Sequence, residues 1–536
     1  MENINKEFEY DECIVKGGCS INPILSSVHE VILIYLEELA FYLLELDTFG
    51  AHNEKIKSDI IDFFSAIIEN IEYNQENLNK VISALYEELY QAKELYTDFC
   101  KKNNITINYL KSAIKISKKF TVTEAIKQGQ RFLLKKDKMF TEEQKKNNEA
   151  LLIILKSICI YMVELRDLKV NIDEAYKKLL MALNIMNFDK ISAQKIDETI
   201  KEFVRLDYEL MQKKFNVRKE AFGAFISTEV STSTRKGKAI LVSGSNLKEL
   251  ELILEATKDR GIDIYTHGQM LIAHALPKLK VYPNLVGHYG KGFEHYLSDF
   301  SSFDGAIFLS RLSLNNVEHL YRSRIFTTDV IAPKGVTIIK DKDFEPLLQS
   351  ALSSEGITKD EEYKSIKLGI DEEEFIQKVN EVADKIEKNE IKHVFMIGVP
   401  NRTEAQRKYM EEFLELLEDD CFAFSFTHAN DKDNIFFANV DYAFPFVGEA
   451  LDIFIKRNVF EKSTPIIFYT RCELHTVPIV FNMKYMGIDD IYFADCSPTL
   501  VNPALIEAIR GMLDLKHYTN PRSDFRTIVA KKVSDS

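Results

Sequence analysis

The chain has 536 residues, which is long enough for three or four domains of ~150 residues each. Hydrophobic residues make up 46% of it and charged residues 28%, a composition typical of globular proteins with apolar cores. The formal net charge of −14 argues against a nucleic-acid-binding surface spread over the molecule, because phosphate contacts require clustered lysines and arginines. Only 12 prolines and 20 glycines are present, which disfavours disordered, collagen-like and turn-rich all-β structures.

The N-terminal region has no feature of a targeting or membrane segment. Residues 1–12 are acidic and lack the apolar core of a secretory signal peptide. The most apolar stretch, residues 28–46, contains four glutamates, which would be too costly in a membrane span, so we expect a buried amphipathic helix there. The seven cysteines have no regular spacing and do not indicate a disulfide framework. We therefore expect a cytoplasmic protein that contacts no membrane.

Helical periodicity runs through roughly the first 220 residues, where apolar residues recur at steps of three and four positions. The helices predicted from this pattern cover residues 28–46, 56–73, 77–101, 142–165 and 171–187. Consecutive amphipathic helices of this kind favour an antiparallel bundle. We assign this helical bundle domain to residues 1–227.

The polar stretch 228–237 marks a boundary, after which short apolar runs alternate with amphipathic stretches. Continuous apolar strands that alternate with helices indicate a parallel sheet covered on both faces. We predict a first α/β domain over residues 238–385, in which residues 341–384 are charged and helical. Its strands are expected at 239–243, 262–265, 306–309, 325–328 and 336–339, with a helix at 247–257.

The same alternation continues to the end of the chain, which predicts a second α/β domain over residues 386–536. The expected architecture is thus an N-terminal helical bundle followed by two doubly wound, Rossmann-like parallel-sheet domains. The strands of the last domain are predicted at 393–397, 422–426, 442–446, 465–469 and 490–493, and its helices at 403–417, 448–456 and 474–486.

Ligands of open parallel sheets bind at the carboxyl ends of the strands. We therefore expect the functional side chains in the loops that begin with Ser243, Thr266, Ser310, Gly398, Thr427, Pro445 and Thr470.

Three segments of the chain resemble the hybrid cluster protein family, also called prismane proteins or hydroxylamine reductases. Residues 261–290 resemble a family segment with a Tyr-Thr-His-Gly-Glu-Met core, and residues 321–336 resemble an Arg-Ile-Phe-Thr-Thr segment. Residues 13–23 resemble the second half of its N-terminal cluster-binding motif. The resemblance implies the family's fold and two iron–sulfur centres, one of which is credited with reducing hydroxylamine or nitric oxide.

The first centre of the family is a cubane near the N-terminus, held by four cysteines. Cys13 and Cys19 keep the spacing of the last two, but residues 1–12 contain no cysteine. A four-iron cubane normally needs four thiolates. The pair is therefore either a two-thiol remnant of a cluster site or two ordinary thiols on an inherited loop.

The second centre, a hybrid iron–sulfur–oxygen cluster, is held in the family by one histidine, two glutamates and four cysteines. Most of these positions are occupied here by residues that cannot replace thiolate or carboxylate. We therefore expect no cofactor, with an iron–sulfur cluster or another metal as the less favoured alternative. The resemblance places the family's histidine at Ser245, its first glutamate at Gln269, three of its cysteines near Ser313, Pro400 and His428, and its second glutamate at Glu473; the last cysteine falls within residues 445–447, which contain no sulfur.

Another metal is an alternative at these loops. Cys472 and Glu473 are adjacent after a predicted strand, and His428 follows another, so that a mixed set could suit zinc or mononuclear iron. His475, Cys496, His267 and His274 are further donors near strand ends, although packing or hydrogen bonding would explain the last two.

The sequence contains no dinucleotide fingerprint and no phosphate-binding P-loop. The small-residue turn 242–246 is either an anion site at a helix N-terminus or a simple capped connection.

The leading hypothesis is a degenerate homologue of hydroxylamine reductase, without clusters and without reductase activity, that acts as a binding, regulatory or assembly protein. The alternatives are an oxidoreductase or other enzyme that uses a re-purposed interdomain pocket with a different metal, and a redox protein with a partly ligated N-terminal cluster. We expect an unidentified protein partner or small ligand, no nucleic acid, and a monomer or homodimer. No residue is assigned a catalytic role.

Overall fold

The computed structural model describes residues 23–534 with internal gaps. The longer gaps are 187–192, 399–403, 427–431, 470–474 and 494–515. Shorter gaps fall at 51–53, 69–70, 72, 111–113, 291–294, 315–316, 441–442, 461, 464 and 518. No helix within the described ranges is long and apolar enough to cross a membrane.

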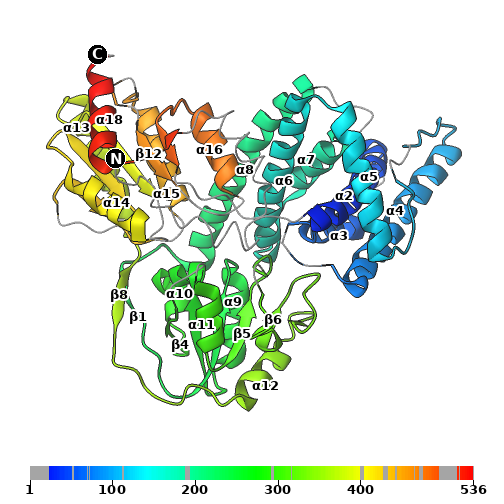
Figure 1. The fold of residues 1–536 in the computed structure, drawn as a ribbon, viewed down its shortest axis with the longest axis horizontal. Helices are drawn as coiled ribbons and strands as arrows, with labels where there is room; N and C mark the ends of the chain where they lie inside the picture. The colour runs from blue at the N-terminus through cyan, green and yellow to red at the C-terminus, as the bar shows by residue number, and fades with distance from the viewer. Residues whose placement is uncertain are drawn as a thin grey trace, which may run out of the picture. The chain divides into compact units, whose positions relative to one another are not determined.

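The predicted mixture of a helical N-terminal region and two parallel sheets is confirmed (Figure 1). All five predicted N-terminal helices form, and two more, α5 and α8, were not predicted. The helices are α2 (Pro23–Thr48), α3 (Glu54–Ser65), α4 (Gln75–Lys102), α5 (Val122–Met139), α6 (Glu142–Asp167), α7 (Asp173–Ile185) and α8 (Ala193–Phe222).

Helix α3 ends at Ser65, eight residues before the predicted end at residue 73, and Tyr73 lies just before the N-cap of α4. Asn74 is the N-cap of α4, and its side chain accepts a hydrogen bond from the backbone N–H of Asn77. An N-cap residue has extended dihedral angles, so helical structure cannot continue through it. Tyr73, beside this cap, donates its hydroxyl to the carbonyl of Ala66 at 2.8 Å and so holds the connection.

Helix α2 is the centre of the helical region and packs against α4, α5 and α7. It buries carboxylates as well as apolar side chains, among them Glu30 and Glu37. Glu30 forms an ion pair with Lys136 of α5. Glu37 has one carboxylate oxygen without a hydrogen-bond partner among the described residues, and burial raises its pKa to about 8 although Lys136 acts in the opposite direction. The core of this region therefore holds a carboxyl group that is protonated at neutral pH.

The buried proton of Glu37 predicts a pH-dependent stability. The folded state keeps this proton up to about pH 8, whereas an unfolded chain releases it near 4.5, so the free energy of unfolding should fall as the pH rises between these values. Glu37→Gln should remove that fall and raise the free energy of unfolding by about 3 kcal/mol at pH 7. Urea unfolding followed by circular dichroism at pH 5 and pH 7 measures the difference. The exposed Glu143→Gln is the control, and an unchanged pH profile in Glu37→Gln would contradict the assignment.

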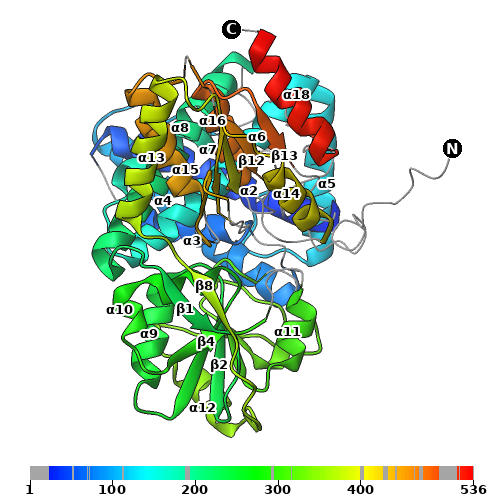
Figure 2. The ribbon, with the colours of Figure 1, turned by 90° about the vertical axis from the view of Figure 1, so that its left-hand side faces the viewer.

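The first sheet has the strand order β4-β3-β2-β5-β6-β7. Every strand predicted for it forms, and β4 is an additional one. Helices α9 and α10 lie to one side of the strands and α11 to the other (Figure 2). The strands are β2 (Lys238–Ser243), β3 (Ile262–His267), β4 (Leu285–His288), β5 (Ala306–Leu309), β6 (Ile325–Thr327) and β7 (Thr337–Ile338), and the helices are α9 (Leu247–Thr257), η1 (Gly268–Ala275), α10 (Pro277–Lys280), α11 (Tyr296–Ser302), η3 (Arg322–Arg324) and α12 (Glu345–Ser353).

The second sheet has the order β11-β10-β9-β12-β13-β14, and its strand pairs are parallel. The strand predicted at 442–446 is wrong, because its described residues, 443–446, begin a helix instead. Pro445 lies in the first turn of that helix, where proline is favoured since no backbone N–H is needed there. The elements are β9 (His393–Gly398), α14 (Glu404–Glu415), β10 (Cys421–Ser425), β11 (Ile435–Phe437), α15 (Phe444–Lys456), β12 (Ile466–Tyr469), α16 (Thr476–Tyr485), β13 (Ile491–Phe493), β14 (Lys516–His517) and α18 (Pro521–Ser534).

A short antiparallel ribbon corrects two details of the prediction. The polar stretch 228–237 begins with β1 (Thr228–Ser231), which pairs with β8 (Ser365–Leu368). Residues 341–384 are therefore not helical throughout, since β8 separates α12 from α13 (Glu372–Glu387).

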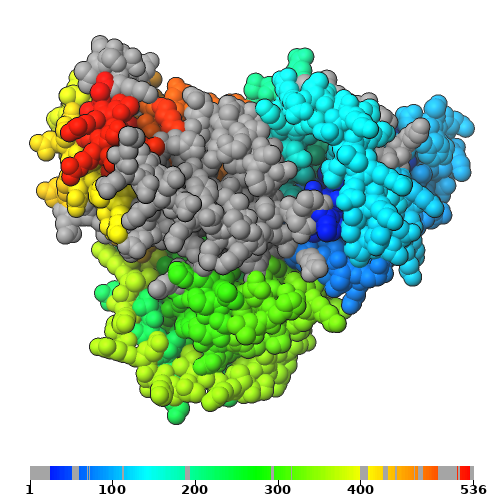
Figure 3. Space-filling view, viewed as in Figure 1, coloured from blue at the N-terminus to red at the C-terminus, as the bar shows by residue number. Residues whose placement is uncertain are grey.

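The chain divides into two compact units. The described residues within Met1–Leu210 and Leu309–Lys342 belong to the first unit, and those within Met211–Phe308 and Asp343–Pro498 to the second, together with the C-terminal helix. The residues of α9 to α11, which belong to the second unit, are coloured green in the space-filling view (Figure 3). The predicted domain boundaries 1–227, 238–385 and 386–536 remain a prediction.

Candidate functional site

The carboxyl ends of β2 and β3 bring three polar side chains of the second unit together. In the parallel register the last residues of the two strands, Ser243 and His267, are direct partners. The Ser243 hydroxyl lies 3.1 Å from Nδ1 of His267, and Nε2 of the same ring lies 3.2 Å from a carboxylate oxygen of Asp299 in α11. The ring lies between a hydroxyl and a carboxylate, as expected for side chains at the end of a parallel sheet.

The imidazole of His267 is held in one tautomer. Burial lowers its pKa, while Asp299 raises it less, so that the ring is neutral at physiological pH. A carboxylate can only accept a hydrogen bond, so Nε2 carries the proton and Nδ1 accepts from the Ser243 hydroxyl. Tyr296 and Phe300 enclose the ring, with centroids 5.0 and 4.9 Å away.

Serine, histidine and aspartate also form hydrolytic triads, but the arrangement here differs from them. In a triad the serine meets Nε2 and the carboxylate meets Nδ1, whereas these contacts are reversed around His267. The Ser243 residue is 1% exposed and so does not reach solvent. We interpret the set as a hydrogen-bonded anchor of the turn that follows β2.

Two further histidines meet at Thr266, the residue before His267. Its hydroxyl lies 3.0 Å from Nε2 of His274 and 2.9 Å from Nδ1 of His288. Burial lowers the pKa of His274 to about 4 and that of His288 well below its ordinary value. The structure therefore accounts for His267 and His274 by hydrogen bonding, and no group of three or more potential metal ligands occurs among the described residues.

The turn after β2 and the helix after β3 carry two positions that the resemblance assigns to cluster ligands. Ser245 lies in that turn, and the next residue, Asn246, caps α9 by accepting from the N–H groups of Lys248 and Glu249 at 3.1 and 3.2 Å. The turn thus uses the side-chain cap that was one of the two interpretations of residues 242–246. Gln269 is the second residue of η1 and is partly buried.

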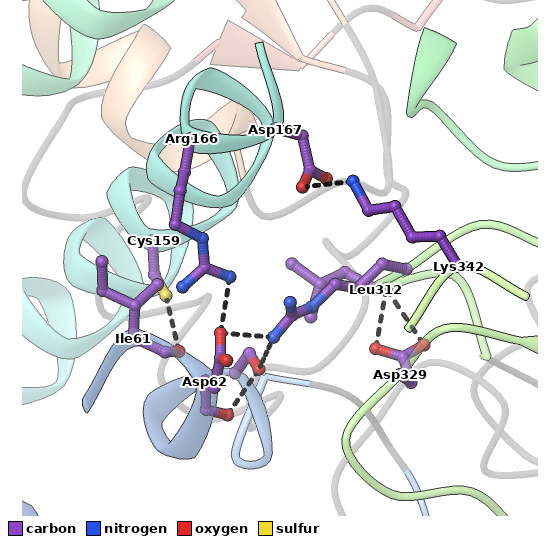
Figure 4. A network of polar contacts seen from close by, with 10 residues as sticks. Ile61, Asp62, Cys159, Arg166, Asp167, Leu312, Asp329 and Lys342 are labelled. Atoms are coloured by element: carbon purple, nitrogen blue, oxygen red, sulfur yellow. Dashed lines mark hydrogen bonds and ion pairs between the residues drawn. The ribbon is translucent and has the colours of Figure 1, made fainter. Parts of the chain in front are cut away.

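Ser313 lies in the first unit, in the loop after β5. Two carboxylates, of Asp329 and Asp62, hold the two residues that precede it (Figure 4). Both carboxylate oxygens of Asp329 accept the N–H of Leu312 at 3.1 Å, and Leu312 has a positive φ of 64°. Such a conformation is unfavourable for a branched side chain and persists only where its surroundings enforce it. The Ser313 hydroxyl lies 3.3 Å from that of Ser310, so this strained loop determines where both hydroxyls point.

The preceding residue, Arg311, is held by the second carboxylate. Its guanidinium donates to Asp62 at 2.8 Å and to Ser65 at 3.2 Å, and Arg166 donates to the same Asp62 oxygen at 2.6 Å (Figure 4). The nearby thiol of Cys159 donates to the carbonyl of Ile61, and burial raises its pKa to about 12. This cysteine is a protonated core residue rather than a metal ligand.

The remaining predicted site residues lie outside the described part of the chain. They are Cys13, Cys19, Pro400, His428, Cys472 and Glu473, together with Cys496. The sequence analysis missed Asp62, Asp299 and Asp329, which hold the loops after the strands. No spacing links them to their partners, because they are brought together only by folding.

The Asp329 contact makes a testable prediction. Asp329→Ala should release the Leu312 N–H and permit this residue to leave its strained conformation, at a cost of about 2 kcal/mol for the lost buried hydrogen bonds. Hydrogen exchange followed by mass spectrometry should show faster exchange of the peptide that contains residues 310–314. Asp329→Asn keeps one accepting oxygen and is expected to exchange at an intermediate rate. Equal exchange in the parent protein and Asp329→Ala would contradict this role.

Comparison with known proteins identifies similar chains. The Prismane/CO dehydrogenase family model matches residues 48–426. A hydroxylamine reductase of Thermodesulfovibrio yellowstonii is 26% identical over 542 residues, covering 96% of this chain and 98% of the relative. A hydroxylamine reductase of Acidiphilium cryptum is 23% identical over 535 residues, covering 97% and 96%. Carbon monoxide dehydrogenase IV of Carboxydothermus hydrogenoformans is a structural match with a TM-score of 0.47 and 12% identity, covering 99% of this chain and 94% of that one.

These matches contradict the expectation that no cofactor is present. The matching family, named for prismane and carbon monoxide dehydrogenase, consists of iron–sulfur cluster proteins, and the two curated relatives are hydroxylamine reductases. The expectation gave most weight to the side chains at the family's own ligand positions and less to other sets of cysteine, histidine and carboxylate ligands, which metals also bind. It is withdrawn.

Proposed function

Because the chain belongs to the Prismane/CO dehydrogenase family, we propose that it keeps the scaffold of its hydroxylamine reductase relatives but acts as a binding, regulatory or assembly protein without their reductase activity. One observation carries this proposal. The three positions at which the resemblance places cluster ligands, and which the structure describes, are Ser245, Gln269 and Ser313. They offer two hydroxyls and an amide.

The chemistry of these groups does not fit the family's hybrid cluster. Bridged iron–sulfur centres are held mainly by thiolates, and serine and glutamine side chains are neutral at physiological pH. The loops themselves are firmly held by Asp299 and Asp329, so the difference lies in the donor atoms. A folded site with altered donors supports a change of function better than a general loss of structure does.

Hydroxylamine turnover tests the proposal. The protein and the Thermodesulfovibrio yellowstonii relative are both prepared anaerobically, and their kcat/KM for hydroxylamine is compared in one assay with a chemical electron donor. We expect a value lower by roughly 100-fold or more, the scale of loss that follows damage to a metal site. Iron and acid-labile sulfide are measured on the same samples, so that an inactive protein is distinguished from one that lost its cofactor during preparation. Turnover comparable with that of the relative would overturn the proposal.

A second candidate function is an oxidoreductase that holds a different metal with Cys472, Glu473 and His428. The matches to metal-cluster proteins favour it, and thiolate, carboxylate and imidazole together suit zinc or iron. Glu473→Gln should then lower the stoichiometric zinc or iron that survives dialysis, measured by mass spectrometry of the metal, while the exposed Glu143→Gln leaves it unchanged. A metal content unaffected by Glu473→Gln would remove this candidate.

A further inference from the structure

A groove in the second unit has the size of a small-molecule site. Its volume is about 360 Å³, and sites for small ligands start at roughly 300 Å³. All of its lining residues lie away from Ser245 and Gln269 in the sequence. They come from the end of α8 (Lys219), the first turns of α13 (Glu372, Glu373, Ile376 and Gln377) and α15 (Glu449).

One wall of the groove is rigid and carries balanced charge. The Glu372 side chain is 8% exposed and accepts from Arg218 at 3.0 Å, from Lys219 at 2.8 Å and from the backbone N–H of Phe225 at 2.9 Å. The Arg218 guanidinium lies 3.8 Å from the ring centroid of Phe225 and 4.4 Å from that of Phe215. Arg218, Lys219 and the Phe225 N–H therefore hold the Glu372 carboxylate in the absence of a ligand, and they neutralise its charge. We assign Glu372 a structural role.

The groove also contains a carboxylate without a cation of its own. Glu449 forms no hydrogen bond or ion pair with the other described side chains. It is half-buried, and burial together with the negative charge of Glu372 raises its pKa more than the positive charges of Lys219 and Arg218, which pair with Glu372, lower it. A second carboxylate, Glu373, lines the same groove. A positive charge placed beside Glu449 would relieve both the burial cost and the repulsion.

The walls select against an anion and against a metal ion. The backbone N–H groups of Glu373 and Glu374, at the start of α13, each donate to the carboxylate of the capping Asp371 at 3.0 Å. They are therefore not available to attract an anion. Glu373 and Glu449 would also repel a negative charge. No group of three or more side chains that could hold a metal ion occurs in the described part of the chain, which disfavours a metal ion in the groove.

We propose that this groove binds a small organic cation, an alkylamine or a guanidinium compound. Its charged head would lie between Glu449 and Glu373, and its methylene groups would pack on Ile376, the apolar residue of the lining. The amide of Gln377 donates to Glu381 at 3.0 Å, which leaves its carbonyl oxygen to accept from the ligand. This binding activity is separate from the proposed loss of reductase function and does not depend on it.

Isothermal titration calorimetry on the full chain tests the proposal, with putrescine and agmatine as cationic probes and glutarate as an anionic probe of similar length. We expect saturable binding of at least one cationic probe and none of glutarate. Glu449→Gln should weaken that binding by roughly tenfold or more, because it removes the charge that the ligand neutralises. Glu374→Gln is the matched control, since this glutamate belongs to the same helical turn but does not line the groove.

The variant is expected to fold normally, because it removes an unpaired and partly buried charge. Its thermal unfolding should occur at or above the temperature of the parent protein. Failure of both cations to bind would overturn the proposal. Equal affinity of the parent protein and Glu449→Gln, or glutarate binding in the presence of Glu449, would overturn it as well.

Discussion

The parallel register of β2 with β3 is the constraint on which the polar cluster of the second unit depends. It pairs Ser243 with His267, while the neighbouring register of β3 with β4 pairs Thr266 with His288. A shift of β3 by one residue would turn Thr266 and His267 to the opposite faces of the sheet and would separate both from their partners. Both strands are buried along nearly their whole length, so the same shift would also disrupt the packing of apolar side chains on the two faces of the sheet. Burial of hydrophobic side chains therefore determines the geometry of the polar ones.

Carboxylates at loops and helix ends in both units are paired with bases that lie close to them. The partly buried Asp62 has Arg166 and Arg311, and the buried Glu372 has Arg218. A buried ion is costly unless it is paired and hydrogen-bonded, so such groups hold loops and helix ends in one position. Other acids of the described residues are not paired in this way, and two of them illustrate different outcomes. Glu37 avoids the cost by keeping its proton in the core of α2, whereas Glu449 faces a groove from which a ligand can supply the missing charge.

The accuracy of each predicted helix or strand depends on how strongly its local sequence pattern favours one structure over another. Helices α4, α6 and α7 and most of the apolar strands were predicted within a few residues, since burial imposes a period of 3.6 or 2 on the sequence, whereas α3 ends earlier than predicted and α5 and α8 were missed. The strand at 442–446 was wrong because an apolar run of five residues is compatible with either structure, and Pro445 acts here as the start of a helix. Helix α5 was missed although Thr121 and Glu124 form a capping box at its N-terminus, a signal that could have located it. The expectation of no cofactor failed because it inferred the state of the whole molecule from a few ligand positions.

The amino-acid sequence by itself determined the helical bundle, the two parallel sheets and the family resemblance, because each depends on residue order or on periodicity along the chain. Only the tertiary structure placed Asp299 beside His267, 32 residues away, and Asp62 beside Arg311, 249 residues away. Such contacts leave no periodic trace, since a single charged residue in a loop has the same local pattern whether it meets solvent or a buried partner. The positions of the loops at the strand ends were therefore predictable from strand order, whereas the groups that hold those loops were decided by how distant segments pack.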